Sequence, residues 1–315
     1  MTYSAGSLIQ AADYNGFAGG SAGANVSGQI NTVFSTGNGN AGYGQTAVSN
    51  VSVGGTVTAA QWTTLVNAVN TVRKHQSGAG FSNLSTYAVG STINATQNFS
   101  SNLTTAYTNR LIYDGVGTLV TGSTQTLTVS SAQTTAAVQA TSTRTVTFAS
   151  TDQARYFFNA GGFIRVVITG YTNTGATVRG ATLGGLAQNG WGGKTIYSNQ
   201  SSARQGTGYT VITDVTTNSG WYGLSGNTTL SNIGGSLYGA VYSDDWFRLT
   251  ATPSGAAGSY GGKGNVLTLA LTAQSGPESA PQWNDSLNVA INYRVDVQYP
   301  STGYLANTWG AVTVA

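Results

Sequence analysis

The sequence has little of what enzymes and metal proteins commonly use. Its 315 residues include no cysteine, one histidine and four prolines, and only 7% of them are charged. Without cysteine the chain forms no disulfide, no zinc–thiolate site and no thiol nucleophile. The only imidazole available as a base is that of His75, which lies at the end of a predicted helix.

Long apolar segments are also absent. No apolar run approaches the roughly 18 residues of a membrane-spanning helix, so we expect no membrane span. The first residues, MTYSAG, lack the basic and then apolar stretches of a secretory signal peptide, and we expect the protein to be made and kept in a cytoplasm. The 12 basic and 9 acidic residues are scattered, with no basic run longer than Arg73-Lys74, so we expect no nucleic-acid partner.

Glycine and hydrophobic residues are abundant and regularly placed. Glycine contributes 44 residues, hydrophobic residues 40% and aromatic residues 10%, which distinguishes the chain from a disordered one. From Thr118 onward, apolar and polar residues alternate with the period of two that predicts β-strands. In the clearest run, residues 287–299, alternate residues are apolar over a length of about 43 Å at ~3.3 Å per residue. Strands with one apolar face predict antiparallel sheets, and we expect a β-sandwich or jelly-roll-like domain.

Residues 154–171, ARYFFNAGGFIRVVITGY, contain two apolar runs separated by Asn159-Ala160-Gly161-Gly162. This pattern predicts two central, largely buried strands joined by a tight turn. Both faces of residues 163–168 are apolar except at Arg165. We expect that arginine to form an ion pair or to stand at the end of the sheet.

The N-terminal part contains a weak internal repeat. Residues 9–17, IQAADYNGF, align without gaps to residues 57–65, VTAAQWTTL. Thr58 is a good N-cap, and the apolar residues after it follow the i, i+3, i+4, i+7 spacing that predicts a helix from about Ala59 to about His75. The apolar residues of the repeat and of this helix are candidates for docking to a partner: Tyr14, Phe17, Trp62, Leu65 and Val69.

The composition divides the chain into three parts. Residues 1–80 form the helical docking region, residues 119–315 form the antiparallel β-domain, and residues 81–118 form a linker. Within the linker, residues 86–115 have loose helical spacing at Phe99, Leu103, Tyr107 and Leu111.

Several short motifs match functional patterns without the context those patterns need. GGSAG (19–23) lacks the strand, helix and histidine of a nucleophile elbow, and GNGNAG (37–42) lies outside any βαβ unit, so we expect a loop there. The adjacent Asp244 and Asp245 are possible calcium ligands, but a solvated turn before Trp246 is the favoured interpretation. We expect no catalytic residue, metal or cofactor, although carboxylate pairs that form only in space are left open.

The tryptophans offer a stronger signal than the charged residues. Most of them neighbour Gly or Asn, as is typical of loops and strand ends. Aromatic side chains there either pack in the core or an interface, which we favour, or stack on sugar rings. The residues concerned are Trp191, Trp221, Tyr222, Trp246, Trp283 and Trp309.

Several segments resemble, in matching order, virion structural proteins of tailed bacteriophages, particularly tail- or neck-associated proteins of marine and cyanobacterial phages. The more specific segments are RYFFNAGG (155–162) and the stretch from Trp62 to Gln76. The segments that carry the resemblance are AADYNGF (11–17), GYGQ (42–45), VTAAQWTTLVNAVNTVRKHQSG (57–78), ARYFFNAGGFIRVV (154–167), YGGKGNVLTLAL (260–271) and YPSTGYLANTWGAVTV (299–314).

The resemblance implies a non-enzymatic structural component of a virion, tail-, neck- or fibre-associated, assembled in the cytoplasm of a host bacterium. The partners it implies are other virion proteins. Because low charge favours association, we also expect a homo-oligomer, with a trimer slightly favoured. The alternatives are a receptor-recognition module that binds host-surface glycan through its tryptophan loops, and a capsid decoration protein.

Overall fold

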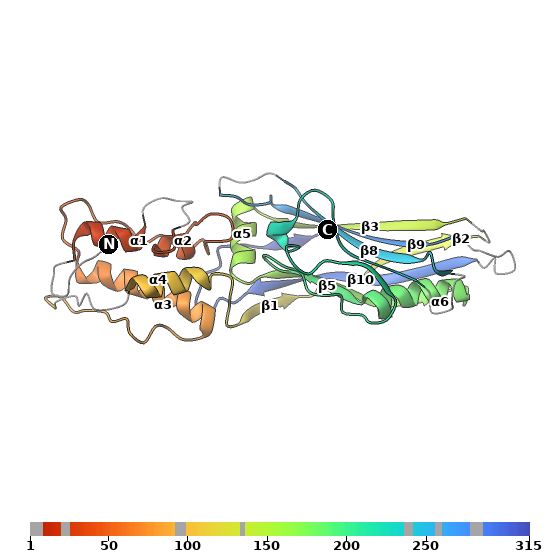
Figure 1. The fold of residues 1–315 in the computed structure, drawn as a ribbon, viewed down its shortest axis with the longest axis horizontal. Helices are drawn as coiled ribbons and strands as arrows, with labels where there is room; N and C mark the ends of the chain where they lie inside the picture. The colour runs from red at the N-terminus through yellow and green to blue at the C-terminus, as the bar shows by residue number, and fades with distance from the viewer. Residues whose placement is uncertain are drawn as a thin grey trace.

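The computed structural model describes residues 9–19, 26–91, 99–132, 136–235, 242–255, 260–277 and 286–315. The molecule is elongated, with short helices at one end, a β-sandwich at the other and one helix, α5, across the boundary between them (Figure 1). Among the described helices, none has the length and apolar character needed to cross a bilayer.

The helical end confirms the predicted helix and explains the repeat. Its helices are α1 (Ala11–Ala18), α2 (Ile30–Phe34), α3 (Ala59–Ser77) and α4 (Phe99–Thr108). At the start of α3 the backbone N–H of Thr58 donates to Gln61 Oε1 at 2.8 Å, and at the start of α1 that of Gln10 donates to Asp13 Oδ2 at 3.2 Å. Both are the reciprocal half of a capping box. The repeat therefore encodes two helix starts, which a β-bridge between Gln10 and Thr56 places side by side.

Two antiparallel sheets form the sandwich and confirm the expected fold class. The first contains β1 (Val116–Val120), β2 (Gln125–Ser131), β4 (Phe163–Asn173), β5 (Gly193–Ile196) and β10 (Leu287–Pro300), in the order β1-β10-β4-β5, with β2 also paired to β10. The second contains β3 (Val138–Phe148), β6 (Thr210–Asp214), β7 (Thr228–Gly234), β8 (Trp246–Pro253), β9 (Val266–Ser275) and β11 (Val312–Val314), in the order β11-β3-β9-β8-β7-β6.

The longest strand, β10, is the centre of the first sheet. It pairs with β2 along its first half, with β1 along its second half and with β4 on the other side. The predicted apolar face is buried from Leu287 through Val297. On the other face, Arg165 of β4 donates to Asp296 Oδ2 at 2.8 Å, which confirms the expected ion pair. Arg294 donates to the same carboxylate at 3.0 Å.

The strand predicted within residues 154–159 is wrong, because this segment is helical. Helix α5 spans Thr151–Asn159 and begins at Ser150, whose hydroxyl accepts a hydrogen bond from the N–H of Gln153 at 3.1 Å. The apolar run suits one face of a short helix as well as it suits a strand, and the cap decides between them. The turn and the second strand are as predicted, since Gly161 has a φ of 93° and β4 begins at Phe163.

The segment predicted as a helical linker is only partly helical. Helix α4 covers Phe99–Thr108, residues 81–91 contain no helix, and the prediction for residues 92–98 lies outside the described residues. Phe99 and Leu103 of the expected stripe are buried, whereas Tyr107 and Leu111 are half-buried. Helix α4 contacts α2 and α3, so it is part of the helical end.

The side of the sandwich where β5 and β6 lie is closed by a helical segment. Helix α6 (Val178–Gly185) and the π-helical turn η1 (Leu186–Trp191) contact strands of both sheets. Leu183, Leu186 and Trp191 are fully buried and join the hydrophobic core there. A short 3-10 turn, η2 (Trp221–Gly223), lies near α5.

Candidate functional site

The predicted docking residues form the core of the helical end rather than its surface. The rings of Phe17 and Trp62 pack on Phe99 of α4, with centroids 5.0 and 5.2 Å apart. Their role is to hold the helices together. All five are at most 2% exposed: Tyr14, Phe17, Trp62, Leu65 and Val69.

The two most exposed apolar side chains at this end lie on two turns of the same construction. In residues 52–55 and 88–91, the N–H of the fourth residue donates to the carbonyl of the first, at 2.9 and 3.1 Å. The third residues, Gly54 and Gly90, have φ values of 77° and 85°, as a type II turn requires. The second residues are Val53 and Val89, which are 100% and 95% exposed. These two valines therefore contribute almost nothing to the packing of the fold.

Both valine turns lie near the N-terminal end of α3, far from the sandwich. Val53 shortly precedes α3, and Trp62 in its first turn donates to the carbonyl of Ser85, close to the second turn. The other end of α3 reaches the sandwich, where Tyr304 donates to the carbonyl of Gly78 at 3.2 Å. With 19 residues at ~1.5 Å each, α3 is about 28 Å long. The two turns thus mark the far tip of the molecule, which we name the valine tip (52–55 and 88–91).

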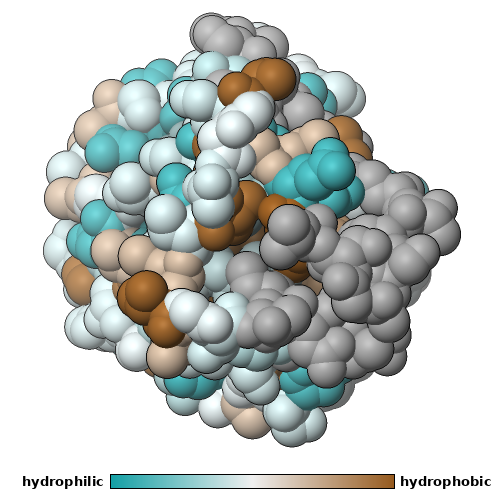
Figure 2. All heavy atoms as spheres, turned by 90° about the vertical axis from the view of Figure 1, so that its left-hand side faces the viewer, coloured by the Kyte–Doolittle hydropathy of each residue, from teal (hydrophilic) through white to brown (hydrophobic). Residues whose placement is uncertain are grey.

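The helical end is almost uncharged. Of the 12 basic and 9 acidic residues, only Asp13, Arg73 and Lys74 lie within residues 1–109. Arg73 and Lys74 are near the C-terminal end of α3, away from the valine tip. Seen end-on, the coloured surface is largely pale, with hydrophobic residues as separate spots (Figure 2). Such a face offers little charge for the electrostatic steering of a charged partner.

The helical end and the sandwich meet at residues 36–42, which we name the junction loop. Its backbone carbonyls converge on Arg155 of α5, which donates to those of Thr36 and Ala41, both at 3.0 Å, and of Gly39 at 3.3 Å. Arg155 is fully buried and also forms a 2.8 Å ion pair with Asp152. This buried guanidinium satisfies backbone acceptors that would otherwise lose water on folding.

Two further side chains bind the same loop. Asn159 donates to the carbonyl of Gly42 at 3.0 Å, and the hydroxyl of Tyr222 donates to the carbonyl of Gly39 at 2.6 Å. The loop needs glycine to approach so closely, because a Cβ on Gly42 would lie 2.2 Å from the carbonyl oxygen of Thr36. The expected loop at GNGNAG is thus confirmed, and it has a structural role that its sequence alone did not show.

A second set of contacts ties the residues after the loop to the C-terminal segment. Gln45 donates to the carbonyl of Ala306 at 3.0 Å and accepts from its N–H at 2.9 Å. Thr308 donates to the carbonyl of Tyr43 at 2.6 Å. These contacts and those of the junction loop join the two ends of the molecule through buried polar groups.

The single histidine belongs to this junction. Its ring meets that of Tyr43 edge-on, with centroids 5.1 Å apart, and His75 is 2% exposed. Burial lowers the pKa of His75 to about 4, so the ring is neutral at physiological pH. Burial likewise raises the pKa of Tyr43. His75 is closed off from solvent and therefore has no access to an external substrate.

No known protein family, curated protein or solved structure matches this chain.

The tryptophans predicted as glycan or interface contacts are mostly in the core. Trp191, Trp221 and Trp309 are at most 1% exposed, so their rings are not available to a sugar. Trp246 is half-buried at the start of β8, and the guanidinium of Arg248 lies 4.6 Å from the centre of its ring. Tyr222 is half-buried with its hydroxyl bound at the junction, and Trp283 lies outside the described residues.

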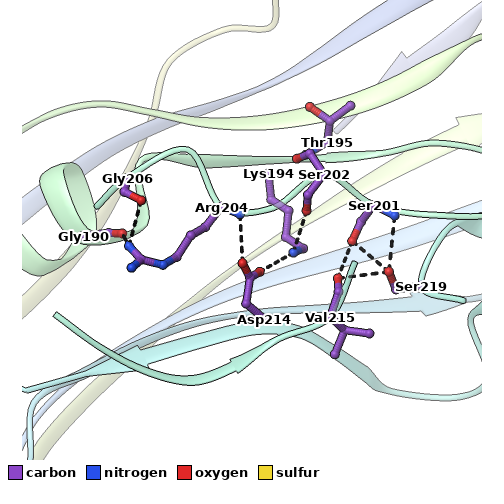
Figure 3. Close-up of polar contacts among 10 residues, drawn as sticks. All are labelled: Gly190, Lys194, Thr195, Ser201, Ser202, Arg204, Gly206, Asp214, Val215 and Ser219. Atoms are coloured by element: carbon purple, nitrogen blue, oxygen red, sulfur yellow. Dashed lines mark hydrogen bonds and ion pairs between the residues drawn. The ribbon is translucent and has the colours of Figure 1, made fainter. Parts of the chain in front are cut away.

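A buried ion pair fixes the connection between β5 and β6 (Figure 3). Lys194, fully buried on β5, donates to Asp214 of β6 at 2.5 Å and to the carbonyl of Ser202 at 2.9 Å. Burial, opposed by Asp214, lowers the pKa of Lys194. Arg204 bonds to the carbonyls of Gly190 and Gly206, and its own N–H donates to Asp214 at 3.1 Å. Every group in this cluster is occupied by a structural contact, so the cluster closes a loop and leaves no reactive group free.

Asp245 differs from the solvated turn expected at Asp244-Asp245. Asp244 is exposed, but Asp245 is 1% exposed and accepts from the N–H of Gly276 at 2.9 Å. Burial raises the pKa of Asp245 to about 7, against the opposing effects of Gly276, Ser275 and Arg179. Within the described ranges, no group of three His, Asp or Glu side chains lies close enough together to bind a metal ion.

Proposed function

We propose that the protein is a non-enzymatic structural component of a tailed-phage virion, associated with the tail, neck or a fibre and assembled in the host cytoplasm. In this proposal the valine tip docks to another virion protein, and the β-sandwich projects from the particle or packs on it. The junction keeps the two ends in one orientation.

The observation that carries the proposal is the convergence of the segments behind the phage resemblance. GYGQ (42–45), RYFFNAGG (155–162), YGGKG (260–264) and YPSTGYLANTW (299–309) are far apart in the sequence, yet all contribute to the junction. The segment YGGKG joins the junction through Tyr260, whose carbonyl accepts from the N–H of Gly39 at 2.7 Å. The contacts of the other segments are those described above. Several of the segments behind the resemblance therefore belong to one set of residues that interact in space, which supports a shared structural role for them.

The proposal is tested by immunogold electron microscopy of virions from the phage that encodes this chain, with antibody against residues 119–315. Label at the tail, neck or baseplate is the expected result. Label spread over the head would replace this role with that of a capsid decoration protein. Particles without label would contradict the proposal in both forms.

The valine tip can be tested separately through incorporation into particles. Replacing both valines, Val53→Asp and Val89→Asp, should lower the copies per virion at least about tenfold, since burying each valine contributes ~1.5 kcal/mol or more. Circular dichroism and the thermal midpoint should not change, because both side chains are fully exposed.

Val178→Asp is the matched control, because Val178 is an exposed valine on α6, where an acidic residue at the helix start is tolerated. It should enter virions at the wild-type level. Normal incorporation of the double variant would show that docking uses a different surface.

A further inference from the structure

The exposed large hydrophobic residues of the strands are confined to two edge strands. On β1 these are Val116, Leu119 and Val120, which are 41–51% exposed, and on β6 they are Val211 and Ile212, at 48% and 56%. Strand β1 ends the first sheet and β6 ends the second, on opposite sides of the sandwich. Edge strands of monomeric proteins are usually protected by charged side chains or proline, and β1 has neither.

A groove lies beside β1 at the open side of the sandwich. It has a volume of about 180 Å³ and separates β1 from β11, the last strand of the facing sheet. Within the described sheets β1 pairs only with β10 and β11 only with β3, although the hydroxyl of Tyr299 bonds the N–H and the carbonyl of Val312. The groove is lined mainly by valines, with one cation: Val120, Val295, Val297, Val312, Val314 and Arg144.

The opposite side of the sandwich presents a strand that suits this groove. Within the described sheets strand β6 pairs on one side only, with β7, and its exposed Val211 and Ile212 lie at a bulge, where the register against β7 shifts between Val211 and Thr213. Asp244 lies near the start of β6. The first residue of β6, Thr210, pairs with Gly234, and the N–H of the next residue, Gly235, donates to the carbonyl of Asp245.

The two sides are also complementary in charge. Arg144 is half-buried in the groove and Asp244 is exposed beside β6. In the part of the chain that the structure describes, neither residue takes part in an ion pair. An unpaired cation in an apolar groove and an unpaired anion beside an apolar strand favour each other over an uncharged surface.

We propose that the occupant of the groove is a second copy of this chain, whose β6 edge docks beside β1 and β11. The side chains of Val211 and Ile212 cover the valines of the groove, and Asp244 pairs with Arg144. Both halves of the contact are present on every copy, which favours the chain itself as the partner. The contact is head-to-tail, so it repeats from copy to copy and closes as a ring or continues as a filament. It goes beyond the proposed function, because it applies wherever the protein acts.

The test is light scattering coupled to size-exclusion chromatography on the full chain. The wild type should be an oligomer, and Val120→Lys and Ile212→Lys should each raise the dissociation constant at least about tenfold, while Val178→Lys should not. Circular dichroism must show that each variant is folded. A wild-type monomer at high micromolar concentration, or a folded variant that still forms the wild-type oligomer, would overturn the proposal.

Mixing the two variants distinguishes this contact from any other. The intact groove of Ile212→Lys can accept the intact β6 of Val120→Lys, so the mixture should form dimers although neither variant does alone. Likewise Arg144→Asp and Asp244→Arg should each weaken association, and the double variant should restore it. If the mixture remains monomeric, or the double charge reversal does not restore association, the copies associate through another surface.

Discussion

Replacing Arg155 with alanine is expected to lower the free energy of unfolding by about 3–5 kcal/mol, as is typical when one partner of a buried ionic network is removed. The guanidinium is fully buried and satisfies the carbonyls of Thr36, Gly39 and Ala41. Without it the carbonyls of Thr36 and Ala41 lose the donor that replaces water, whereas that of Gly39 keeps the hydroxyl of Tyr222. Urea unfolding of the full chain, followed by tryptophan fluorescence, measures the loss. Amide hydrogen exchange should also rise in residues 36–42.

Arg165→Ala is the matched control. Arg165 also forms a 2.8 Å ion pair, but 29% of its side chain is exposed and Arg294 remains on the same carboxylate of Asp296. Its loss should cost about 1 kcal/mol or less. Equal losses for the two variants would mean that Arg155 does not hold the junction. Arg155→Lys should recover little of the stability, because one ammonium cannot reach all the carbonyls that a planar guanidinium does.

The second large effect is a pH dependence caused by Asp245. Its pKa rises from the ordinary 3.8 to about 7 on folding, so the protonated form is the one that the fold stabilises. The stabilisation is fully present below about pH 4 and is lost as the pH rises through 7. At 1.36 kcal/mol per pKa unit, the change is about 4 kcal/mol. Asp245→Asn mimics the protonated side chain and should be more stable than wild type at pH 8 by up to that amount.

The measurement is the difference in unfolding free energy between Asp245→Asn and wild type from pH 4 to pH 8. A difference is needed because His75 acts in the opposite sense. Its pKa falls from 6.5 to about 4 on folding, so its contribution is present above pH 6.5 and is lost as the pH falls through 4. Asp244→Asn, at the exposed neighbouring position, should leave the profile nearly unchanged. A flat difference for Asp245→Asn would show that its carboxylate is solvated.

The elements that could be predicted are those whose signals are local. Helix α3 has an N-cap at Thr58 and an apolar stripe, and β10 has an unbroken alternation over residues 287–299. Each signal is long enough to exclude the other type of structure. The apolar run that ends at Asn159 is too short to distinguish a helix from a strand. The N-cap that makes it helical, Ser150, lies just before the run.

The junction could not be predicted, because its contacts depend on the fold. Arg155 reaches carbonyls more than 110 residues earlier, and a backbone carbonyl carries no sequence signature. Asp244 and Asp245 show the same difficulty. They are identical neighbours in the sequence, yet Asp244 is exposed and Asp245 is buried. At the helical end, the apolar residues with the clearest pattern are core, whereas Val53 and Val89 stand in turns where no periodicity marks them.

These long separations determine when the chain can finish folding during synthesis. Ala306, the partner of Gln45, is translated 261 residues after it. Thr308, the partner of Tyr43, is translated 265 residues after it. Strand β10, on which β1, β2 and β4 all pair, is also translated late. The junction can therefore be completed only after translation passes Thr308, and such non-local contacts make folding slow. A chain terminated before Ala306 lacks these contacts, so its two ends are not held in one orientation.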